Sequence, residues 1–187
     1  IKFMERDKTW VAPSGATLWM SYLDRDDDVM RYQGQAFNWI GFDELTQWPT
    51  PYPWNYMRSR LRTTKDSSLP LYMRATSNPG GPGHQWVKKT FIDPSEHNTP
   101  YWATDIDSGE VIRWPRGHSR EGEPLFKRKF IPATLFDNPY LSDDGMYEAN
   151  LLSLPEHQRR QLLEGDWDIN EGAAFPEFNR KIHVVEP

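Results

Sequence analysis

Two adjacent carboxylates, Asp43 and Glu44, are the side chains best placed to do chemistry, because they directly follow the mostly apolar run 37–42. Such a run predicts a strand that is buried on both faces, as in a parallel sheet. Ligands of open α/β sheets bind beyond the carboxyl ends of the strands. There one acid can hold Mg²⁺ while its neighbour polarises a water, which is the form of a Walker B element. A solvated Asp-Glu turn is the alternative.

A second apolar run, residues 69–75, ends in small polar side chains that can hydrogen-bond a phosphate or an attacking water. These are Thr76, Ser77 and Asn78. The Gly- and Pro-rich loop 79–83 comes next, and we expect its backbone N–H groups to be free for an anion; a turn without a ligand is the alternative. The loop is not a P-loop, because Lys88 comes five residues after Gly83 instead of directly after it. The sequence contains no Walker A motif.

Two basic clusters could contact the phosphates of a nucleotide or of DNA. They are Arg58, Arg60 and Arg62, followed by Lys88 and Lys89. We predict helices over 54–62, with Arg58 and Arg62 on the side opposite its apolar face, and over 84–91. A basic surface that pairs with nearby acids is the alternative for these residues.

Composition narrows the class of protein. The 187 residues are 37% hydrophobic and 26% charged, and they include nine Trp, eight Tyr and nine Phe, which predicts a packed soluble domain with a tail. A net charge of -5 counts against a protein that coats nucleic acid. The absence of Cys excludes disulfides and Cys-ligated zinc. No apolar run approaches the ~20 residues of a membrane span, so we expect a cytoplasmic protein without a membrane partner.

Short elements must position these groups. Two strands are predicted about the turn 13–15, and a short helix that begins in the acidic run 24–28 should end at Gly34. Further predictions are a hairpin about 107–109, a strand at 126–132 with Lys127 and Lys129 on one side, and helices at 143–152 and 155–163. No internal repeat is visible.

Five separated segments together resemble the large subunit of tailed-bacteriophage terminases, the motors that pump double-stranded DNA into a procapsid. The matching segments occur in the same order and spacing over roughly residues 10–170. They are RYQG at 31–34, WIGFDE at 39–44, ATSNPGG at 75–81, FIPATL with DNP at 130–139, and LEGDW at 163–167.

The resemblance implies a role for each candidate residue. Asp43 would be the acid associated with Mg²⁺ and Glu44 the general base, while Thr76, Ser77 and Asn78 would sense the γ-phosphate and couple hydrolysis to DNA movement. The implied fold is α/β, part of a P-loop NTPase-type parallel sheet flanked by helices, with an added β-hairpin. In it the strand at about 71–77 lies beside the strand that ends at Asp43, and between it and the P-loop strand.

The resemblance also implies a domain organisation. Residues 1–166 would be the C-terminal part of the ATPase domain, and 167–187 a linker toward a nuclease domain that is absent from the chain. The P-loop strand and the Walker A motif would precede residue 1, so we expect the fragment to be inactive by itself.

The implied cofactors are ATP and Mg²⁺. The implied partners are double-stranded DNA, a portal protein, a terminase small subunit and further copies in a homo-oligomeric ring, all in the cytoplasm of a bacterial host. Two alternatives stay open from the residues. One is a nucleic-acid-binding module without nucleotide chemistry, which would use the basic clusters together with Lys127 and Lys129. The other is a metal-dependent nuclease built on Asp43, Glu44 and Asp137.

Overall fold

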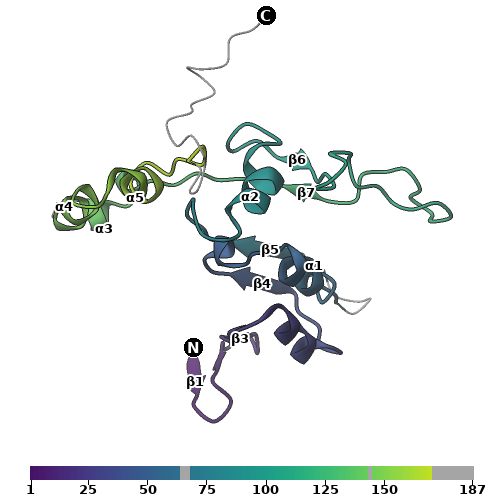
Figure 1. Cartoon of the computed structure of the whole chain (residues 1–187). Helices are drawn as coiled ribbons and strands as arrows, with labels where there is room; N and C mark the ends of the chain where they lie inside the picture. Colours follow the sequence, from purple (N-terminus) through teal and green to yellow (C-terminus); the bar gives the residue numbers. More distant parts are fainter. Residues whose placement is uncertain (64–67, 143–144, 170–187) are drawn as a thin grey trace, which may run out of the picture.

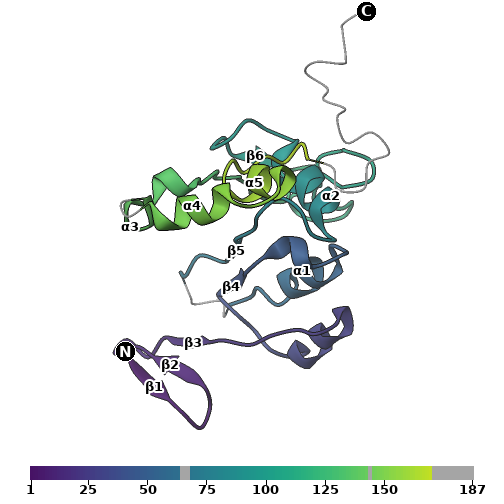
Figure 2. The ribbon, with the colours of Figure 1, turned by 60° about the vertical axis from the view of Figure 1, so that its left-hand side comes forward.

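The structure is a computed structural model that describes residues 1–63, 68–142 and 145–169. These residues form three tiers (Figures 1 and 2). A small sheet lies at one end, two parallel strands with a helix lie in the middle, and short helices with a long hairpin arm lie at the other end. In the described ranges no helix is long and apolar enough to cross a membrane.

The middle tier is a parallel pair of strands. β4 (Trp39–Phe42) pairs with β5 (Tyr72–Ala75), and Phe42 lies opposite Ala75. The chain between them contains α1 (Tyr52–Arg58), since parallel strands need a long crossover connection. The predicted adjacency of the two strands is confirmed, while the larger sheet stays a prediction. Residues that follow β4 and β5 therefore emerge at the same edge.

The prediction that the first of these strands is buried on both faces is wrong. Ile40 is buried and Phe42 half-buried, but Trp39 is 44% exposed and Gly41 is also exposed. The indole of Trp39 folds back over Gly41, where a Cβ would lie 2.4 Å from the ring. The outer face of β4 is thus exposed, with the Trp39 ring lying over Gly41. A run of apolar residues in the sequence does not reveal this.

Two hydrophobic cores contact this strand pair. The first has Leu45, Trp54, Trp86, Val87 and Trp167 as its buried residues. The second has Val29, Tyr32, Ile40 and Met57. Phe42 of β4 and Met73 of β5 pack against both cores. The strand pair therefore joins the two.

The N-terminal tier is an antiparallel sheet of β1 (Lys2–Met4), β2 (Thr9–Val11) and β3 (Thr17–Trp19). The two strands predicted about the turn 13–15 are confirmed, whereas β1 was not predicted. The expected acidic helix is present as the 3₁₀ helix η1 (Asp26–Tyr32), and the chain turns at Gly34 with φ +84°.

The first basic helix is shorter than predicted. α1 ends at Arg58 instead of continuing to Arg62, because Leu61 forms a parallel bridge to Phe37 and the Arg62 N–H donates to the Phe37 carbonyl. Arg62 also donates through Nη2 to the Gly34 carbonyl at 2.7 Å. Arg58 and Arg62 therefore do not share a helix face.

The hairpin arm spans residues 99–130. It follows α2 (His84–Val87) and the π-helical turn η3 (Lys88–Ile92), which together fill the predicted helix 84–91. β6 (Tyr101–Trp102) pairs with β7 (Lys127–Arg128), and the predicted hairpin about 107–109 closes with a Thr104–Val111 bridge. The arm extends to one side of the middle tier (Figure 1).

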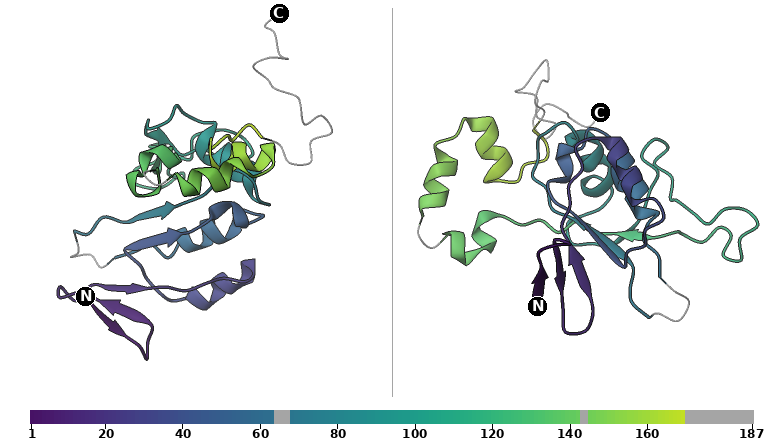
Figure 3. Two further views of the ribbon diagram at one scale, coloured as in Figure 1. Left: turned by 90° about the vertical axis from the view of Figure 1, so that its left-hand side faces the viewer. Right: turned by 90° about the horizontal axis from the view of Figure 1, so that it is seen from below.

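Short helices occupy the opposite side (Figure 3). They are η4 (Leu135–Asp137), α3 (Pro139–Ser142), α4 (Met146–Leu152) and α5 (Glu156–Leu162). The predicted helices at 143–152 and 155–163 are confirmed where the structure describes them. Residues 170–187 of the predicted linker lie outside the described residues.

Candidate functional site

The predicted acid pair and the polar segment 76–78 meet at the carboxyl edge of the strand pair. Thr76 Oγ1 donates a hydrogen bond to Asp43 Oδ1 and accepts one from the Glu44 N–H at 3.4 Å. The backbone continues the pairing, because the Leu45 N–H donates to the Thr76 carbonyl at 2.9 Å and the Thr76 N–H to the Phe42 carbonyl at 3.0 Å. The parallel register thus places a hydroxyl between two carboxylate-bearing residues.

Ser77 and Asn78 are held by a residue that sequence reasoning missed, Thr46. This side chain is 2% exposed and belongs to the 3₁₀ turn η2 (Leu45–Gln47). Its N–H donates to Ser77 Oγ, the Ser77 hydroxyl donates to Thr46 Oγ1, and Thr46 Oγ1 donates to the Asn78 carbonyl, each at 3.0 Å. Asn78 Nδ2 donates to Glu44 Oε1 at 3.4 Å. In the sequence, the signal that could have identified Thr46 was its position two residues after Glu44.

Glu44 has an unusual backbone conformation. Its φ of 51° and ψ of 57° lie in the left-handed region, which costs a residue with a Cβ about 1–2 kcal/mol. This turn sends Leu45 and Thr46 into the interior while the Glu44 side chain stays exposed with that of Asp43. Such outliers concentrate at functional sites, where the surrounding structure holds them in place.

The loop 79–83 packs against η2 instead of presenting all its amides to an anion. The Gly83 N–H donates to the Thr46 carbonyl at 2.7 Å, and the Gly80 N–H donates to His84 Nδ1 at 2.8 Å. A Cβ on Gly83 would lie 2.0 Å from the Trp48 carbonyl oxygen. The expectation that the loop's N–H groups are free is therefore wrong for these two amides. Both already donate hydrogen bonds to groups against which the loop packs.

The C-terminal helices contact the other side of this loop. His84 is buried and stacks on Trp167, with ring centroids 5.4 Å apart and an interplanar angle of 24°. Gln161 of α5 lies so close to Gly80 that a Cβ there would be 2.8 Å from its Nε2. Sequence reasoning gave His84, Gln161 and Trp167 no role at the site, since contacts across more than 70 residues leave no local pattern.

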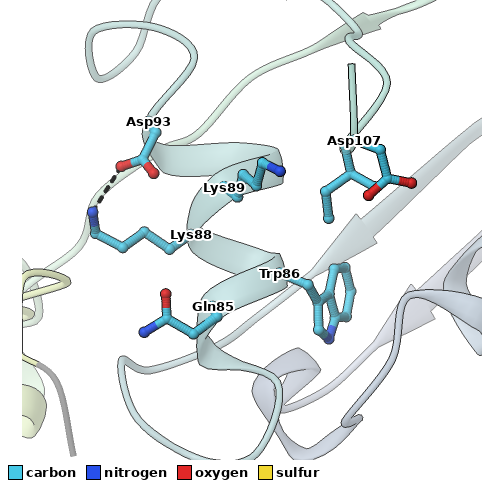
Figure 4. Close-up of a pocket in the computed structure, with 7 residues that line it drawn as sticks. Gln85, Trp86, Lys88, Lys89, Asp93 and Asp107 are labelled. Carbon is cyan, nitrogen blue, oxygen red and sulfur yellow. Dashed lines mark hydrogen bonds and ion pairs between the residues drawn. The ribbon is translucent and has the colours of Figure 1, made fainter. Parts of the chain in front are cut away.

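The candidate lysines lie beside a separate open cavity of about 500 Å³ (Figure 4). Lys88 forms ion pairs with Asp93 at 2.8 Å and Asp168 at 3.2 Å. Burial lowers the pKa of Lys88, but hydrogen bonds to these two carboxylates outweigh it, so the pKa lies above its ordinary value. The Lys88 charge is thus compensated within the chain, and Lys89 projects from the same turn toward the side of Asp107.

The candidate arginines differ in their surroundings. Arg60 hydrogen-bonds Ser59 Oγ through Nε at 3.1 Å and lies 5.2 Å from the Tyr56 ring centre. Arg58 is half-buried and lies 4.4 Å from the ring centre of Phe126 in the arm. The two side chains therefore face different parts of the molecule.

The carboxylates of the site are the candidate donors for a metal ion. Within the described ranges, no three or more His, Cys, Asp or Glu side chains form a group that could hold a metal ion. Asp137 closes a capping box, with its Oδ2 accepting from the Thr134 N–H at 2.7 Å and the Thr134 hydroxyl at 2.9 Å. The nuclease alternative, a metal cluster of Asp43, Glu44 and Asp137, is therefore not assembled. Asp43 and Glu44 supply the exposed carboxylate oxygens that a hard cation prefers.

The chain matches a known protein family over most of its length. Residues 1–182 match the family model described as terminase large subunit, T4-like-virus type, N-terminal. No curated protein and no solved structure matches the chain. The matched range includes β4, β5 and every residue of the site.

Proposed function

Because this chain belongs to the family of terminase large subunits of the T4-like-virus type, we propose that its strand-end site cleaves the γ-phosphate of ATP. Members of this family are components of the motor that packages phage DNA. The finer proposal is that residues 1–166 supply part of the ATPase domain, on a P-loop NTPase-type sheet, and that 167–187 lead toward a nuclease domain. Hydrolysis would drive the translocation of double-stranded DNA.

One observation carries the proposal, which is the pairing of each acid with a polar group from the neighbouring strand. Asp43 accepts from the Thr76 hydroxyl, and Glu44 accepts from the Asn78 amide at 3.4 Å. Hydrolysis of a nucleotide needs a charge-holding acid, a base for water and a group that responds to the phosphate. The parallel register of β4 and β5 brings a candidate for each of these roles to one edge, which supports the proposal.

We assign the two carboxylates different roles. Asp43 would hold Mg²⁺, whose charge offsets that of the phosphates. Glu44 would orient the attacking water and take its proton, since its side chain is exposed and its left-handed backbone turns it away from the buried η2. The Asn78 amide would keep the Glu44 carboxylate in the orientation for that transfer.

Thr76, Ser77 and Asn78 would couple hydrolysis to movement. Small polar groups at a strand end can exchange partners without repacking a core. Ser77 and Asn78 are tied to Thr46, and the Thr46 carbonyl is tied to Gly83 at the start of α2. A change of partner at Ser77 or Asn78 would therefore reach α2 through two hydrogen-bonded steps, by way of Thr46.

The proposed setting is the cytoplasm of a bacterial host, where the motor forms a homo-oligomeric ring with a portal protein and a terminase small subunit. A nucleic-acid-binding module without nucleotide chemistry is the weaker proposal. Such a module has no need of a carboxylate pair bonded to a strand-end hydroxyl and amide.

The test is steady-state ATP hydrolysis by the full-length protein. Glu44→Gln keeps the size of the side chain but cannot accept the proton, so we expect at least ~10²-fold slower turnover with nucleotide binding retained. Asp43→Asn should instead weaken the Mg²⁺-dependent part of binding. Glu110→Gln, an equal change at an exposed position in the arm, is the matched control and should hydrolyse ATP at the parental rate. Near-parental turnover in Glu44→Gln would remove Glu44 from the mechanism.

A further inference from the structure

Two arginines flank one aromatic ring where the arm meets α1. The Arg58 guanidinium carbon lies 4.4 Å from the centre of the Phe126 ring, and that of Arg128 lies 5.4 Å from it. Arg58 is the last residue of α1, whereas Arg128 belongs to β7. The fold thus brings two cations together from segments far apart in the sequence.

Neither cation has a carboxylate partner in the part of the chain that the structure describes. The ion pairs found there are Arg31 with Asp28, Lys88 with Asp93 and Asp168, Arg120 with Glu123, and Arg160 with Asp166. Arg58 Nη1 is buried, and it has no hydrogen-bond partner among the described residues. Arg128 Nη1 donates to the Thr104 carbonyl at 3.2 Å, a neutral acceptor.

Burial of these charges without an anion is unfavourable. Burial lowers the pKa of Arg58. Burial, with a further contribution from the nearby Arg58 cation, lowers the pKa of Arg128 to about 10. A buried cation is stable in proteins when it is paired with an anion and its N–H groups are hydrogen-bonded. The two arginines therefore form a site that an oxyanion would complete.

We propose that Arg58 and Arg128, held against Phe126, bind phosphate oxyanions. A guanidinium that stacks on a ring keeps its N–H edge for in-plane hydrogen bonds, and that edge matches two oxygens of a phosphate. Two such groups beside one ring suit one phosphate or two successive phosphates of a strand. A lysine ammonium is a point charge and does not supply this planar fork.

This phosphate site is distinct from the strand-end site. The Phe37 N–H donates to the Arg60 carbonyl at 3.0 Å, so the end of α1 lies beside the amino end of β4. Asp43 and Glu44 follow the carboxyl end of the same strand. The phosphates at Arg58 are therefore not those of a nucleotide held by this chain's own carboxylates, and the backbone of duplex DNA is the source that we favour. That choice of source rests on the proposed function, whereas the oxyanion site does not.

The test measures binding of a labelled DNA duplex to the full-length protein by fluorescence anisotropy over a series of salt concentrations. Arg58→Gln should weaken binding roughly 10-fold. It should also reduce the slope of log K against log salt by about 0.9, the contribution of one phosphate contact. Arg120→Gln removes the same charge from an arginine already paired with Glu123, and should change neither quantity. Circular dichroism establishes that each variant is folded.

A second arm uses inorganic phosphate, which separates the oxyanion site from its source. Phosphate should raise the melting temperature of the parent above that in chloride of equal ionic strength, and Arg58→Gln should lose this rise. Arg128→Lys keeps the charge but not the planar fork, so it should lose most of the rise in melting temperature. This variant replaces Arg58→Gln in the test if Arg58→Gln does not fold.

The outcomes are separable. If folded Arg58→Gln and Arg128→Lys both respond to phosphate as the parent does, the site is not an oxyanion site. If the phosphate response is lost while DNA binding and its salt slope are unchanged, DNA is the wrong source, and a changed KM for ATP would identify nucleotide phosphate. Neither result depends on whether Glu44→Gln abolishes hydrolysis, so the failure of this proposal and that of the proposed function are distinguishable.

Discussion

Gly83→Ala should be the most destabilising single-methyl change in the loop that backs the site. The backbone of Gly83 has φ -95° and ψ 3°, a conformation that residues with a Cβ are allowed, so the effect comes mainly from contact. The new Cβ would lie 2.0 Å from the Trp48 carbonyl oxygen and 2.7 Å from Trp86 Nε1. An ordinary contact is about 3.4 Å or more, so the loop and η2 must separate by more than about 1 Å.

That separation affects two hydrogen bonds as well as packing. The Gly83 N–H donates to the Thr46 carbonyl at 2.7 Å, and Trp86 Nε1 donates to the Trp48 carbonyl at 2.6 Å. Overpacking of this kind costs about 1–3 kcal/mol, and each weakened hydrogen bond up to about 1 kcal/mol. A loss of roughly 3 kcal/mol lowers the melting temperature of a chain of this length by about 6–12 °C.

The assay is thermal unfolding followed by circular dichroism. Gly122→Ala is the matched control, because its φ of +80° disfavours alanine while nothing lies within 4 Å of the added Cβ. Gly122→Ala should lower the free energy of unfolding by about 1 kcal/mol through the backbone conformation alone. The reasoning is refuted if Gly83→Ala melts at or above the temperature of Gly122→Ala, since the loop would then not be packed on η2.

Three further predictions follow from contacts described above. Ser77→Ala removes the hydroxyl that bonds Thr46, so less DNA should be packaged per ATP while hydrolysis continues; an unchanged ratio in a packaging assay would make the segment a simple turn. Trp167→Ala removes the stack on His84 and should cost about 3–5 kcal/mol in chemical unfolding, whereas a change below 1 kcal/mol would show that the helices do not dock there. The pKa of Asp28 lies below its ordinary value of 3.8 because the Asp24 and Arg25 N–H groups donate to its carboxylate. Its stabilising contribution is thus full above the unfolded-state pKa and is lost as pH falls through the lower folded-state value. Asp28→Asn should therefore flatten the fall in melting temperature below about pH 4, and parallel curves would contradict this account.

The sequence was informative about the site where chemistry depends on neighbouring residues. An apolar run that ends in Asp43 and Glu44, and another that ends in Thr76, are local patterns, and the resemblance to terminases placed the two strands side by side. The structure confirms that adjacency. Thr46 could not be assigned, because its importance comes from hydrogen bonds to residues more than 30 positions away.

The errors have physical causes. The sequence predicted a β4 covered on both faces because apolar letters do not reveal that Trp39 lies over Gly41 of its own strand. α1 was predicted too long because helical periodicity continues to Leu61, while the bridge between Leu61 and Phe37 competes for the same backbone groups. The contact of Arg58 with the arm depends on the docking of β7, which no spacing in the sequence encodes.

The sharing of Phe42 and Met73 by both hydrophobic cores has a consequence for cooperativity. Proteins open in units, and the free energy that links two units is carried by the side chains common to both. Here those side chains belong to β4 and β5, immediately before Asp43 and Thr76. Hydrogen exchange of the β4–β5 amides should therefore report the opening of either unit. The site lies at the boundary between the two units, where the unfolding of one lowers the stability of the other.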